Sequence, residues 1–550
     1  MKRRKNEMPT RRKLKPAVMA LMALSLVAAA CSSKGTEQDE PGKGSDPASP
    51  AAQASAKPKM PLVDKPIELT FFSQLDPKIS ATKKNYGDVE AFGILEKESG
   101  IKVKFLHPPA GSEKEQFNLM VSSNDLADIL AVPPSYYNGG AQKMLSDGVI
   151  IRLNELIDKN APNFKKFIDE HPQFKKDMVL DDGTIYAFPT FKIEKINRFT
   201  DGFQIRKDWL DKYGLSVPTT MDEWYKILKT FKEKDPESVP FSAASSNPTW
   251  RDFMSAWAMK WDFYQVGGKV KFGQSQPEFK EYVTTMKKWY DEGLLDPEFA
   301  TNDTKKLDNR ITGGKAGSWN AQLNGGMGRL LDLMKGDPNF KIVGAPNPQA
   351  KDGKTYNLKS GTLSAPQSEL AMVSGSSKKA AEVVKWMDVA YSEWGHNLLN
   401  FGIEGKSYNM VNGYPKLSDA VMKDPKLSVV NALGQYSIGN ACCRFWEEDS
   451  RLAEQVATYP AQLEANKAWA SADSSLNLPI SMTPTAEESQ KLASIMADID
   501  TYNSEMFLRF VYGKEPLSNF DAYQQRLKQM NIEEAVKIQQ AALDRYNKRQ

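Results

Sequence analysis

Strand-like and helix-like segments alternate in the first third of this chain, and this alternation is the feature that most restricts the possible fold. Residues 67–73 (IELTFFS) alternate apolar and polar side chains, and residues 101–107 (IKVKFLH) repeat this period. Between them lies the helical pattern VEAFGILEKESG, with Gly100 at its expected C-cap. The apolar run at 126–132 (LADILAV) reads as a third strand. Strand, helix and strand joined by short links favour a mostly parallel α/β sheet.

Helical patterns dominate the later sequence. Residues 219–231 begin with the capping-box pattern Thr220-x-x-Glu223 and continue with apolar residues at helical spacing. Residues 378–391 and the segment NIEEAVKIQQAALDRY near the C-terminus show the same period, and Trp224, Trp289 and Trp386 in such stretches are expected in the core. Of the 550 residues, roughly 480 remain for globular structure after the N-terminal segments described next, which is enough for two domains.

A basic segment and then an apolar one precede these elements. Residues 1–15 hold eight basic side chains against one acid, Glu7, and an uncharged run of 14 residues follows from Ala17 to Ala30. A membrane-spanning helix needs ~18 or more apolar residues. Residues 1–30 are therefore predicted to be a secretory signal peptide.

Cys31 comes directly after the small residues Ala28, Ala29 and Ala30. This arrangement resembles the lipobox of bacterial lipoproteins, in which the cysteine sulfur takes a diacylglycerol and becomes the mature N-terminus. Lipoboxes favour Leu at the position of Ala28, and an ordinary signal peptide that leaves Cys31 unmodified is the alternative. Residues 31–64, rich in Ser, Gly, Pro, Ala and charge, are predicted to be a disordered tether behind the lipidated cysteine.

The net charge changes sign once the leader is removed. The whole chain carries 73 basic and 69 acidic residues, and residues 1–30 account for eight and one of these. The remainder has 65 basic and 68 acidic residues, a net charge of −3. Nucleic acid is therefore not expected as a partner. Three His and no HExxH or paired CxxC motif predict no metal and no cofactor.

Several segments together resemble one known family. They are GTIYAFP (183–189), GFQIRKDWLDKYGLSVPTTMDEW (202–224), WYDEGLLDPEFATND (289–303), FGIEGKSY (401–408) and ALDRYNKR (542–549). In this order they are similar to the large lipoprotein members of the family 1 extracellular solute-binding proteins, the receptors of carbohydrate ABC importers. The resemblance covers nearly all of residues 65–550.

The resemblance implies a fold of the periplasmic-binding-protein type, class II, with two α/β lobes joined by hinge crossings and a sugar between them. We expect the N-terminal lobe to comprise 65–190 and 365–420, and the C-terminal lobe 191–364 and 421–550. The resemblance also implies an oligosaccharide ligand, ABC permease subunits as partners, and a monomer held at the extracellular face of the cell membrane by its lipid.

One segment departs from the family pattern. Many members carry a calcium loop rich in Asp, Asn and Gly after the helix that here ends in FKEKDP. Such a loop needs several oxygen ligands at alternating positions and a Gly at the turn. This sequence offers only Asp235 and Glu237, with Pro236 between them. No calcium is predicted here.

Sugar sites combine flat aromatic rings with polar groups on loops that face the cleft. The sequence offers eight candidates near strand ends, the expected hinge or glycine-rich loops, each with a core or structural role as its alternative: Ser73, Tyr136, Tyr186, Arg206, Trp250, Trp319, Glu404 and Tyr408. Trp250 and Trp319 are interpreted as loop tryptophans that stack on sugar. Glu404 would accept from a hydroxyl, and Tyr408 would stack. Arg206 could bind a uronate carboxylate, but an ion pair with an acid in the same helical region is favoured.

Two other classes of protein compete with this interpretation. A secreted carbohydrate-active enzyme would need two carboxylates roughly 5–10 Å apart across a sugar site. Acids are too abundant to exclude such a pair, but no GxSxG or Walker A motif or metal spacing is present. A ligand-sensing or adhesive surface lipoprotein would bind ligand with the same fold, and neighbouring permease genes would distinguish it from an importer receptor.

Cys442 and Cys443 are adjacent and, apart from Cys31, are the only cysteines. In an oxidising compartment they could form a vicinal disulfide, bridge to another molecule or stay as two thiols. Adjacent Cα atoms lie about 3.8 Å apart, below the usual ~4.4–6.8 Å of a disulfide, so a vicinal ring would be strained. Two buried thiols that act as small apolar residues are the alternative.

Overall fold

The computed structural model describes residues 57–246, 248–359 and 370–549. The signal peptide, Cys31 and most of the tether predicted at 31–64 lie outside these residues, as does the crossing expected near residue 365. Among the residues that the structure describes, no helix combines the length and apolarity needed to cross a membrane.

The first lobe is built on a five-stranded sheet. Its strand order is β2 (Ile101–Leu106), β1 (Ile67–Ser73), β3 (Ile129–Ala131), β11 (Leu370–Val373) and β4 (Phe188–Pro189). The first three strands are parallel, as predicted, whereas β11 runs antiparallel to both β3 and β4. β11, which follows the second-lobe segments in sequence, therefore lies between β3 and the edge strand β4.

Helices from two separate stretches of the sequence surround this sheet. Gly100 ends α2 with φ 75°, a left-handed conformation suited to glycine, as the C-cap prediction requires. The first-lobe helices are α1 (Pro77–Ser80), α2 (Glu90–Ser99), α3 (Glu113–Ser123), α4 (Gly140–Ser146), α5 (Asn154–Asn160), α6 (Pro162–Glu170), α7 (Pro172–Met178), α14 (Ala380–Asp388), α15 (Glu393–Phe401), α16 (Asp419–Met422), α17 (Val429–Leu433) and α18 (Ser450–Val456), with the hairpin of β12 (Tyr408–Val411) and β13 (Tyr414–Leu417).

The second lobe is built on a four-stranded sheet of order β10 (Ile342–Ala345), β5 (Asp201–Arg206), β9 (Ala316–Gln322) and β6 (Val239–Phe241). β5 is antiparallel to both neighbours, and β6 is parallel to β9. The surrounding helices are α9 (Lys207–Tyr213), α10 (Met221–Lys234), α11 (Glu278–Asp291), α12 (Thr304–Thr312), α13 (Arg329–Leu333), α19 (Pro460–Ala470), α20 (Ala486–Val511), α21 (Phe520–Gln529) and α22 (Ile532–Lys548), with the hairpin of β7 (Phe263–Val266) and β8 (Lys269–Phe272).

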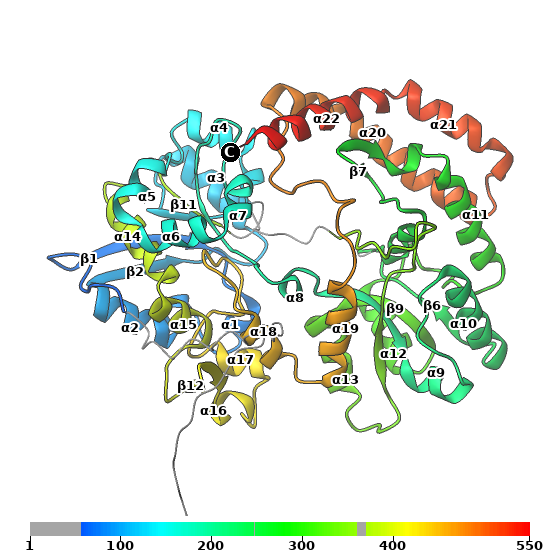
Figure 1. Cartoon of the computed structure of the whole chain (residues 1–550), viewed down its shortest axis with the longest axis horizontal. Helices are drawn as coiled ribbons and strands as arrows, with labels where there is room; N and C mark the ends of the chain where they lie inside the picture. Colours follow the sequence, from blue (N-terminus) through cyan, green and yellow to red (C-terminus); the bar gives the residue numbers. More distant parts are fainter. Residues whose placement is uncertain (1–56, 247, 360–369, 550) are drawn as a thin grey trace, which may run out of the picture. The chain divides into compact units, whose positions relative to one another are not determined.

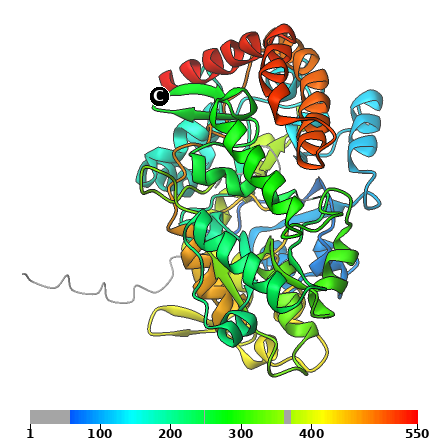
Figure 2. The same cartoon turned by 90° about the vertical axis from the view of Figure 1, so that its right-hand side faces the viewer.

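The elements of each lobe lie together in space (Figure 1): blue, cyan and yellow for the first, green, orange and red for the second. The capping box predicted for the second-lobe helix α10 is present, since Thr220 and Glu223 satisfy each other's backbone N–H groups. Trp224, Trp289 and Trp386 are buried, as expected. Figure 2 shows the C-terminal helices gathered beside the green elements, where α20 packs against α11.

The chain passes between the lobes through α8 (Lys195–Arg198) and again after α18. Hydrophobic contacts run across the boundary expected at residue 420, because Val421, Leu433, Leu452 and Val456 share one cluster with Phe401. We therefore propose that the first lobe extends to about residue 456.

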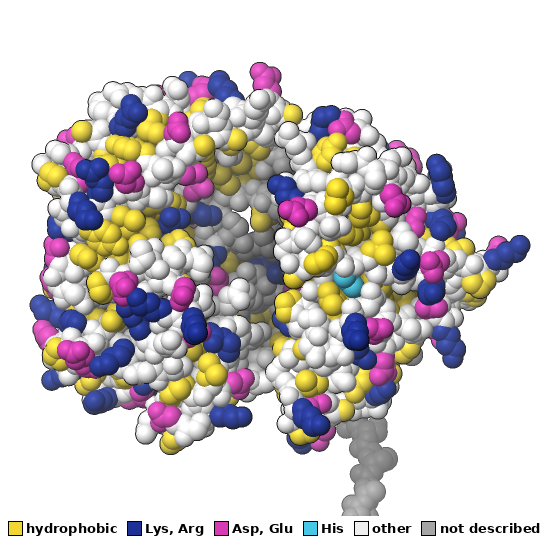
Figure 3. Space-filling model, turned by 180° about the vertical axis from the view of Figure 1, so that it is seen from behind, with side chains coloured by type: hydrophobic (Ala, Val, Ile, Leu, Met, Phe, Trp, Pro, Cys, Tyr) yellow, Lys and Arg dark blue, Asp and Glu magenta, His cyan; other side chains and the backbone are white. Residues whose placement is uncertain are grey.

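The last helix also reaches the first lobe. The Tyr546 hydroxyl donates to Asp177 at 2.8 Å, and Arg545 pairs with Asp181 at 3.1 Å. The space-filling view in Figure 3 shows the surface hollowed between the two lobes. An α/β fold of two lobes, each assembled from separate stretches of chain, is the architecture that the sequence predicted.

Candidate functional site

A pocket of about 880 Å³ lies where strand ends of the two lobes face each other. The first lobe contributes the residues after β1, the start of α17 and the turn before α18; the second contributes Thr200, the end of β9 and α13. The chain between the lobes completes the wall with Lys192 and Asn197 on one side and residues 456–462 on another. Ends of parallel strands are where α/β sheets commonly bind ligands.

The second-lobe wall is a close turn rich in glycine. After β9 the chain forms one π-helical turn, Leu323–Gly328. Gln462 of α19 donates through Nε2 to the Leu323 carbonyl at 3.0 Å and to Asn324 Oδ1 at 2.8 Å. A Cβ at Gly328 would lie 2.7 Å from Gln462 Nε2, so a larger residue here would push the Gln462 amide away from the turn.

Three further contacts fix the outer part of this wall. Arg329 donates to the Gly325 carbonyl and pairs with Asp308, both at 2.8 Å. The Tyr459 hydroxyl donates to Asp332 at 2.6 Å. Burial, followed by this hydrogen bond, raises the pKa of Tyr459 to about 12, so the hydroxyl stays protonated. Tyr459 is also the one aromatic residue among the described residues that line the pocket.

The first-lobe wall is charged and paired internally. Arg444 is buried and pairs with Glu448 at 2.9 Å, while Lys78 donates to the Asn440 carbonyl at 2.6 Å. The Asp76 carboxylate accepts from the Cys442 N–H at 2.8 Å. Lys78 and Asp76 also pair with each other at 3.8 Å, so two ion pairs balance most of the wall's charge.

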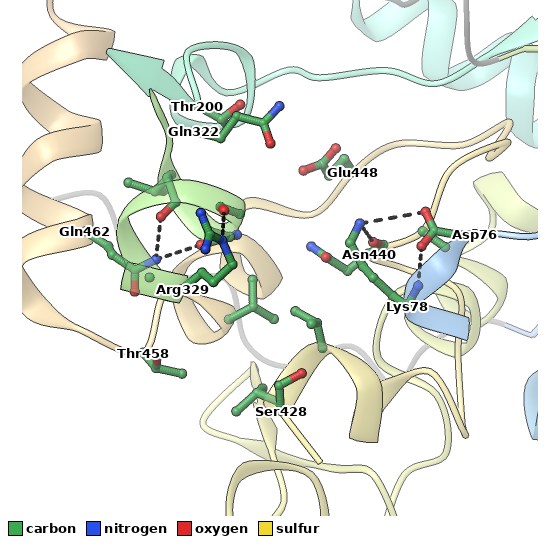
Figure 4. Close-up of a pocket in the computed structure, with 18 of the residues that line it drawn as sticks. Asp76, Lys78, Thr200, Gln322, Arg329, Ser428, Asn440, Glu448, Thr458 and Gln462 are labelled. Atoms are coloured by element: carbon green, nitrogen blue, oxygen red, sulfur yellow. Dashed lines mark hydrogen bonds and ion pairs between the residues drawn. The ribbon is translucent and has the colours of Figure 1, made fainter. Parts of the chain in front are cut away.

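Polar side chains from both walls surround one opening (Figure 4). Gln462 and Arg329 stand opposite Asn440, Lys78 and Asp76. Other labelled residues lie around the same opening: Thr200, Gln322, Ser428, Glu448 and Thr458. Hydroxyl, amide and carboxylate groups converge here, and such groups bind the hydroxyls of a polar ligand.

None of the eight residues predicted from sequence is among the described residues that line this pocket. The loop interpretation of Trp319 was wrong, because Trp319 lies inside strand β9, fully buried, with Nε1 donating to Gln204 at 3.0 Å. Trp250 lies in a 3₁₀-helix, where its ring stacks on Phe507 with centroids 4.3 Å apart. Both rings are packed into the second-lobe core instead of facing a ligand.

Four other candidates also lie in or beside cores. Tyr186 is buried, which raises its pKa to about 12, and Tyr408 in β12 packs against Phe401. Ser73 ends β1 fully buried, and Tyr136 is half-buried against the same cluster as Tyr186. Tyr136 and Ser73 do follow strands of the first sheet, as the prediction assumed.

The remaining two candidates are charged: Arg206 is buried, with its guanidinium over the Phe340 ring, and Glu404 is exposed. Arg206 ends β5 and forms two hydrogen bonds with Asp208 of α9, at 2.8 and 2.6 Å. The favoured alternative, an ion pair with an acid of the same helical region, is therefore the one present. Glu404 is exposed in the turn that precedes Tyr408.

Sequence reasoning missed the amide residues of the pocket. The available signal is in AQLNGGMG, where Gln322 ends a strand and Asn324 comes directly before two glycines. Gln462, which lies more than 130 positions later on α19, carries no local signal that places it beside Asn324.

Comparisons with known proteins agree on the class of protein. Residues 78–395 match the family described as bacterial extracellular solute-binding protein. The fructooligosaccharide ABC transporter substrate-binding protein FusA of Streptococcus pneumoniae is 35% identical over 38% of this chain and 42% of its own length. The lipoprotein LipO and the polygalacturonan/rhamnogalacturonan-binding protein YtcQ of Bacillus subtilis are 25% and 24% identical, over 65% and 71% of this chain and 71% and 73% of theirs.

Solved structures share the fold. The alginate-binding protein AlgQ2 superposes with a TM-score of 0.67 at 27% identity, over 88% of this chain and 99% of that one. FusA in complex with kestose gives a TM-score of 0.68 at 22% identity with the same coverage. FusA is named as the substrate-binding protein of an ABC transporter, and YtcQ and AlgQ2 are named as binding proteins, so each of these relatives is named for binding and not for catalysis.

Proposed function

The chain belongs to the bacterial extracellular solute-binding proteins, and we propose that it captures an oligosaccharide between its two lobes and delivers it to an ABC importer. One observation carries the proposal: a pocket of about 880 Å³ is lined by polar side chains of both lobes. This volume falls within the ~300–1,000 Å³ of small-molecule sites.

The chemistry of the walls supports a sugar ligand. Gln322, Asn324 and Thr200 on the second lobe and Asn440 and Ser428 on the first offer both donors and acceptors. Sugar hydroxyls need both, because each hydroxyl donates one hydrogen bond and accepts others. Relatives named for fructooligosaccharide and for polygalacturonan or rhamnogalacturonan support an oligosaccharide.

The two-walled site also supports a mechanism of capture. A sugar that contacts both lobes binds an arrangement with the lobes close together more tightly than one with the lobes apart. It shifts that equilibrium only by its difference in affinity for the two forms. The closed, loaded form is what partner permease subunits would recognise.

We propose that the protein is a lipoprotein monomer at the extracellular face of the cell membrane, anchored through Cys31. The basic and apolar leader and the small residues before Cys31 support this. The relative LipO is named as a lipoprotein.

Calorimetry with residues 52–550, which form one compact unit, tests the proposal. Neutral and acidic oligosaccharides from plants and microbes would be titrated, and the sugar recovered afterwards by chromatography. We expect saturable binding of at least one oligosaccharide, unchanged on recovery, and a smaller radius of gyration by small-angle scattering at saturation. Conversion of the sugar would contradict a binding role, and an unchanged radius would contradict lobe closure.

A further inference from the structure

Cys442 and Cys443 lie in the wall of the pocket, in the turn between α17 and α18. Cys442 is half-buried and lines the pocket, whereas Cys443 is buried and belongs to the first-lobe core. Their Sγ atoms are 3.0 Å apart. The proposed function makes no use of this pair.

The local backbone brings the two sulfurs together. Successive side chains point to opposite faces of a strand and diverge around a helix, so neighbouring cysteines seldom meet. Here Cys443 has φ 62°, in the left-handed region that non-glycine residues rarely adopt. This backbone conformation therefore places both Sγ atoms on the same side of the turn.

Contacts from distant parts of the chain hold this turn. The Cys442 N–H donates to Asp76 at 2.8 Å, and the Thr190 hydroxyl donates to the Arg444 carbonyl at 2.8 Å. Tyr391 donates to the Phe445 carbonyl at 2.6 Å. The folded structure therefore sets the distance between the sulfurs.

The surroundings of Cys442 favour a reactive sulfur. Gln74 Nε2 donates to Cys442 Sγ at 3.1 Å, and the Tyr86 hydroxyl lies 3.6 Å away. The hydrogen bond from Cys443 is the largest cause that lowers the pKa of the Cys442 thiol; Tyr86 and Gln74 also lower it, whereas burial and the Asp76 charge raise it. The thiolate is the nucleophile in thiol–disulfide exchange.

We propose that Cys442 and Cys443 form a reversible thiol–disulfide site in the pocket wall, oxidised by a small disulfide that enters the pocket. The Cys442 thiolate attacks one sulfur of that disulfide, forms a mixed disulfide and releases one thiol. The Cys443 sulfur, having lost its proton, then attacks Cys442 Sγ, closes the ring and releases the second thiol. The protein loses two protons and two electrons, and the small disulfide takes up both and becomes two thiols.

Oxidation changes the pocket surface. The sulfurs would approach from 3.0 Å to about 2.05 Å, and the thiol protons would be lost. Cys442 Sγ would move toward Cys443 and change its contact with Gln74, which lies two residues before Asp76 of the first-lobe wall. On the premise that the pocket binds a sugar, the two redox states should differ in affinity.

The first experiment needs no sugar. Residues 52–550, which exclude Cys31, would be equilibrated with glutathione and glutathione disulfide at several ratios, denatured, alkylated with iodoacetamide and digested with trypsin. The peptide from Leu427 to Arg444 contains both cysteines. We expect two labels on this peptide under reducing conditions. Under oxidising conditions we expect no label and a mass two hydrogens lower, reversed by dithiothreitol. Two labels at every ratio would overturn the proposal.

Single variants test the order of the steps. Cys443→Ser removes the resolving thiol and should accumulate glutathione on Cys442. Cys442→Ser leaves the buried Cys443 and should accumulate none in the folded protein. Equal adducts on both variants would overturn the assignment of Cys442 as the attacking sulfur. Circular dichroism of each variant would confirm that it is folded.

A final arm separates this proposal from the proposed function. The oligosaccharide found by calorimetry should slow alkylation of Cys442 in the reduced, folded protein several-fold. If the disulfide forms but a bound sugar does not slow the alkylation of Cys442, the placement of the cysteine pair beside the ligand would be overturned. If no sugar binds, the proposed function fails, and the glutathione experiment alone still decides the redox chemistry.

Discussion

The two walls of the pocket are held by different kinds of interaction. In the first lobe, buried Arg444 pairs with Glu448 and donates to the Gly439 carbonyl. In the second lobe, Gln462 holds the turn through neutral hydrogen bonds to Leu323 and Asn324. Breaking a buried ion pair costs far more free energy than losing neutral hydrogen bonds. The first wall is therefore a structural frame, whereas the hydrogen-bonding groups of the second wall can exchange their partners for those of a ligand.

Arg444→Ala should have the largest effect on stability. It leaves Glu448 without the partner that lies 2.9 Å away in a site where both side chains are nearly inaccessible. Removing one member of a buried pair costs about 3–5 kcal/mol. Urea unfolding should show this loss as a lower midpoint.

Arg329→Ala is the matched control on the second wall. Its side chain is 40% exposed and pairs with Asp308, so its loss should cost about 0–1 kcal/mol. Equal losses for the two arginines would break the distinction between the walls.

Acid should also weaken the chain directly after the first wall, where Asp449 caps α18, before it weakens the second wall. Burial alone would raise the pKa of Asp449, but hydrogen bonds from His396 and Arg451 outweigh it and hold that pKa well below its usual value. Because the folded protein releases this proton more readily than the unfolded chain, the stabilisation is present above the unfolded value of about 3.9 and is lost as pH falls below it. Asp449→Asn should therefore flatten the acid side of the stability curve.

Unfolding by urea between pH 2 and pH 5, a range that extends well below the unfolded value, checks this expectation. The wild type should lose more stability than Asp449→Asn across that range, although the variant starts lower because its charged contacts are gone. Hydrogen exchange should show the amides of 444–449 losing protection before those of 323–328. Parallel stability curves for the two proteins would contradict the assignment.

Local patterns predicted the elements better than they predicted the site. The period of residues 67–73 and the Thr220–Glu223 capping box depend on neighbours in sequence, and both predictions were confirmed. Trp319 was mistaken for a loop residue because Gly317 and Ser318 beside it are small. Gly317 is small because a Cβ there would lie 2.5 Å from the Phe231 ring, inside the core. Composition around a residue does not reveal whether small neighbours mark a loop or close packing.

The amide wall should matter more for binding than for folding. Gln462→Ala removes the side chain that orients Leu323 and Asn324, and the loss of about 1.4 kcal/mol would weaken sugar binding about tenfold. Gly328→Ala should also weaken binding, because the added Cβ would lie only 2.7 Å from Gln462 Nε2 and would push this amide away from the turn. Calorimetry with the ligand from the oligosaccharide panel measures both.

Gln524→Ala provides a matched amide deletion outside the pocket lining, since Gln524 donates to the Gln274 carbonyl. It should leave the affinity unchanged. If Gln462→Ala lowered stability as much as Arg444→Ala and left binding intact, the roles assigned to the walls would be reversed.

The smallest effect is expected from removing metal ions, because a lysine already supplies the positive charge in the loop after α10. Lys232 Nζ donates to the carbonyls of Pro236 and Ser238 at 2.7 and 3.0 Å, and the Asp235 carboxylate accepts from the Glu237 N–H at 3.1 Å. A calcium ion would need such oxygens for itself and would meet the ammonium group. Neither EDTA nor added calcium should shift the melting temperature. Lys232→Met keeps most of the side chain but removes the donor, and should lower stability by about 1 kcal/mol. A calcium-dependent rise in melting temperature that Lys232→Met leaves intact would show that this second-lobe loop is held by an ion instead of by its own lysine.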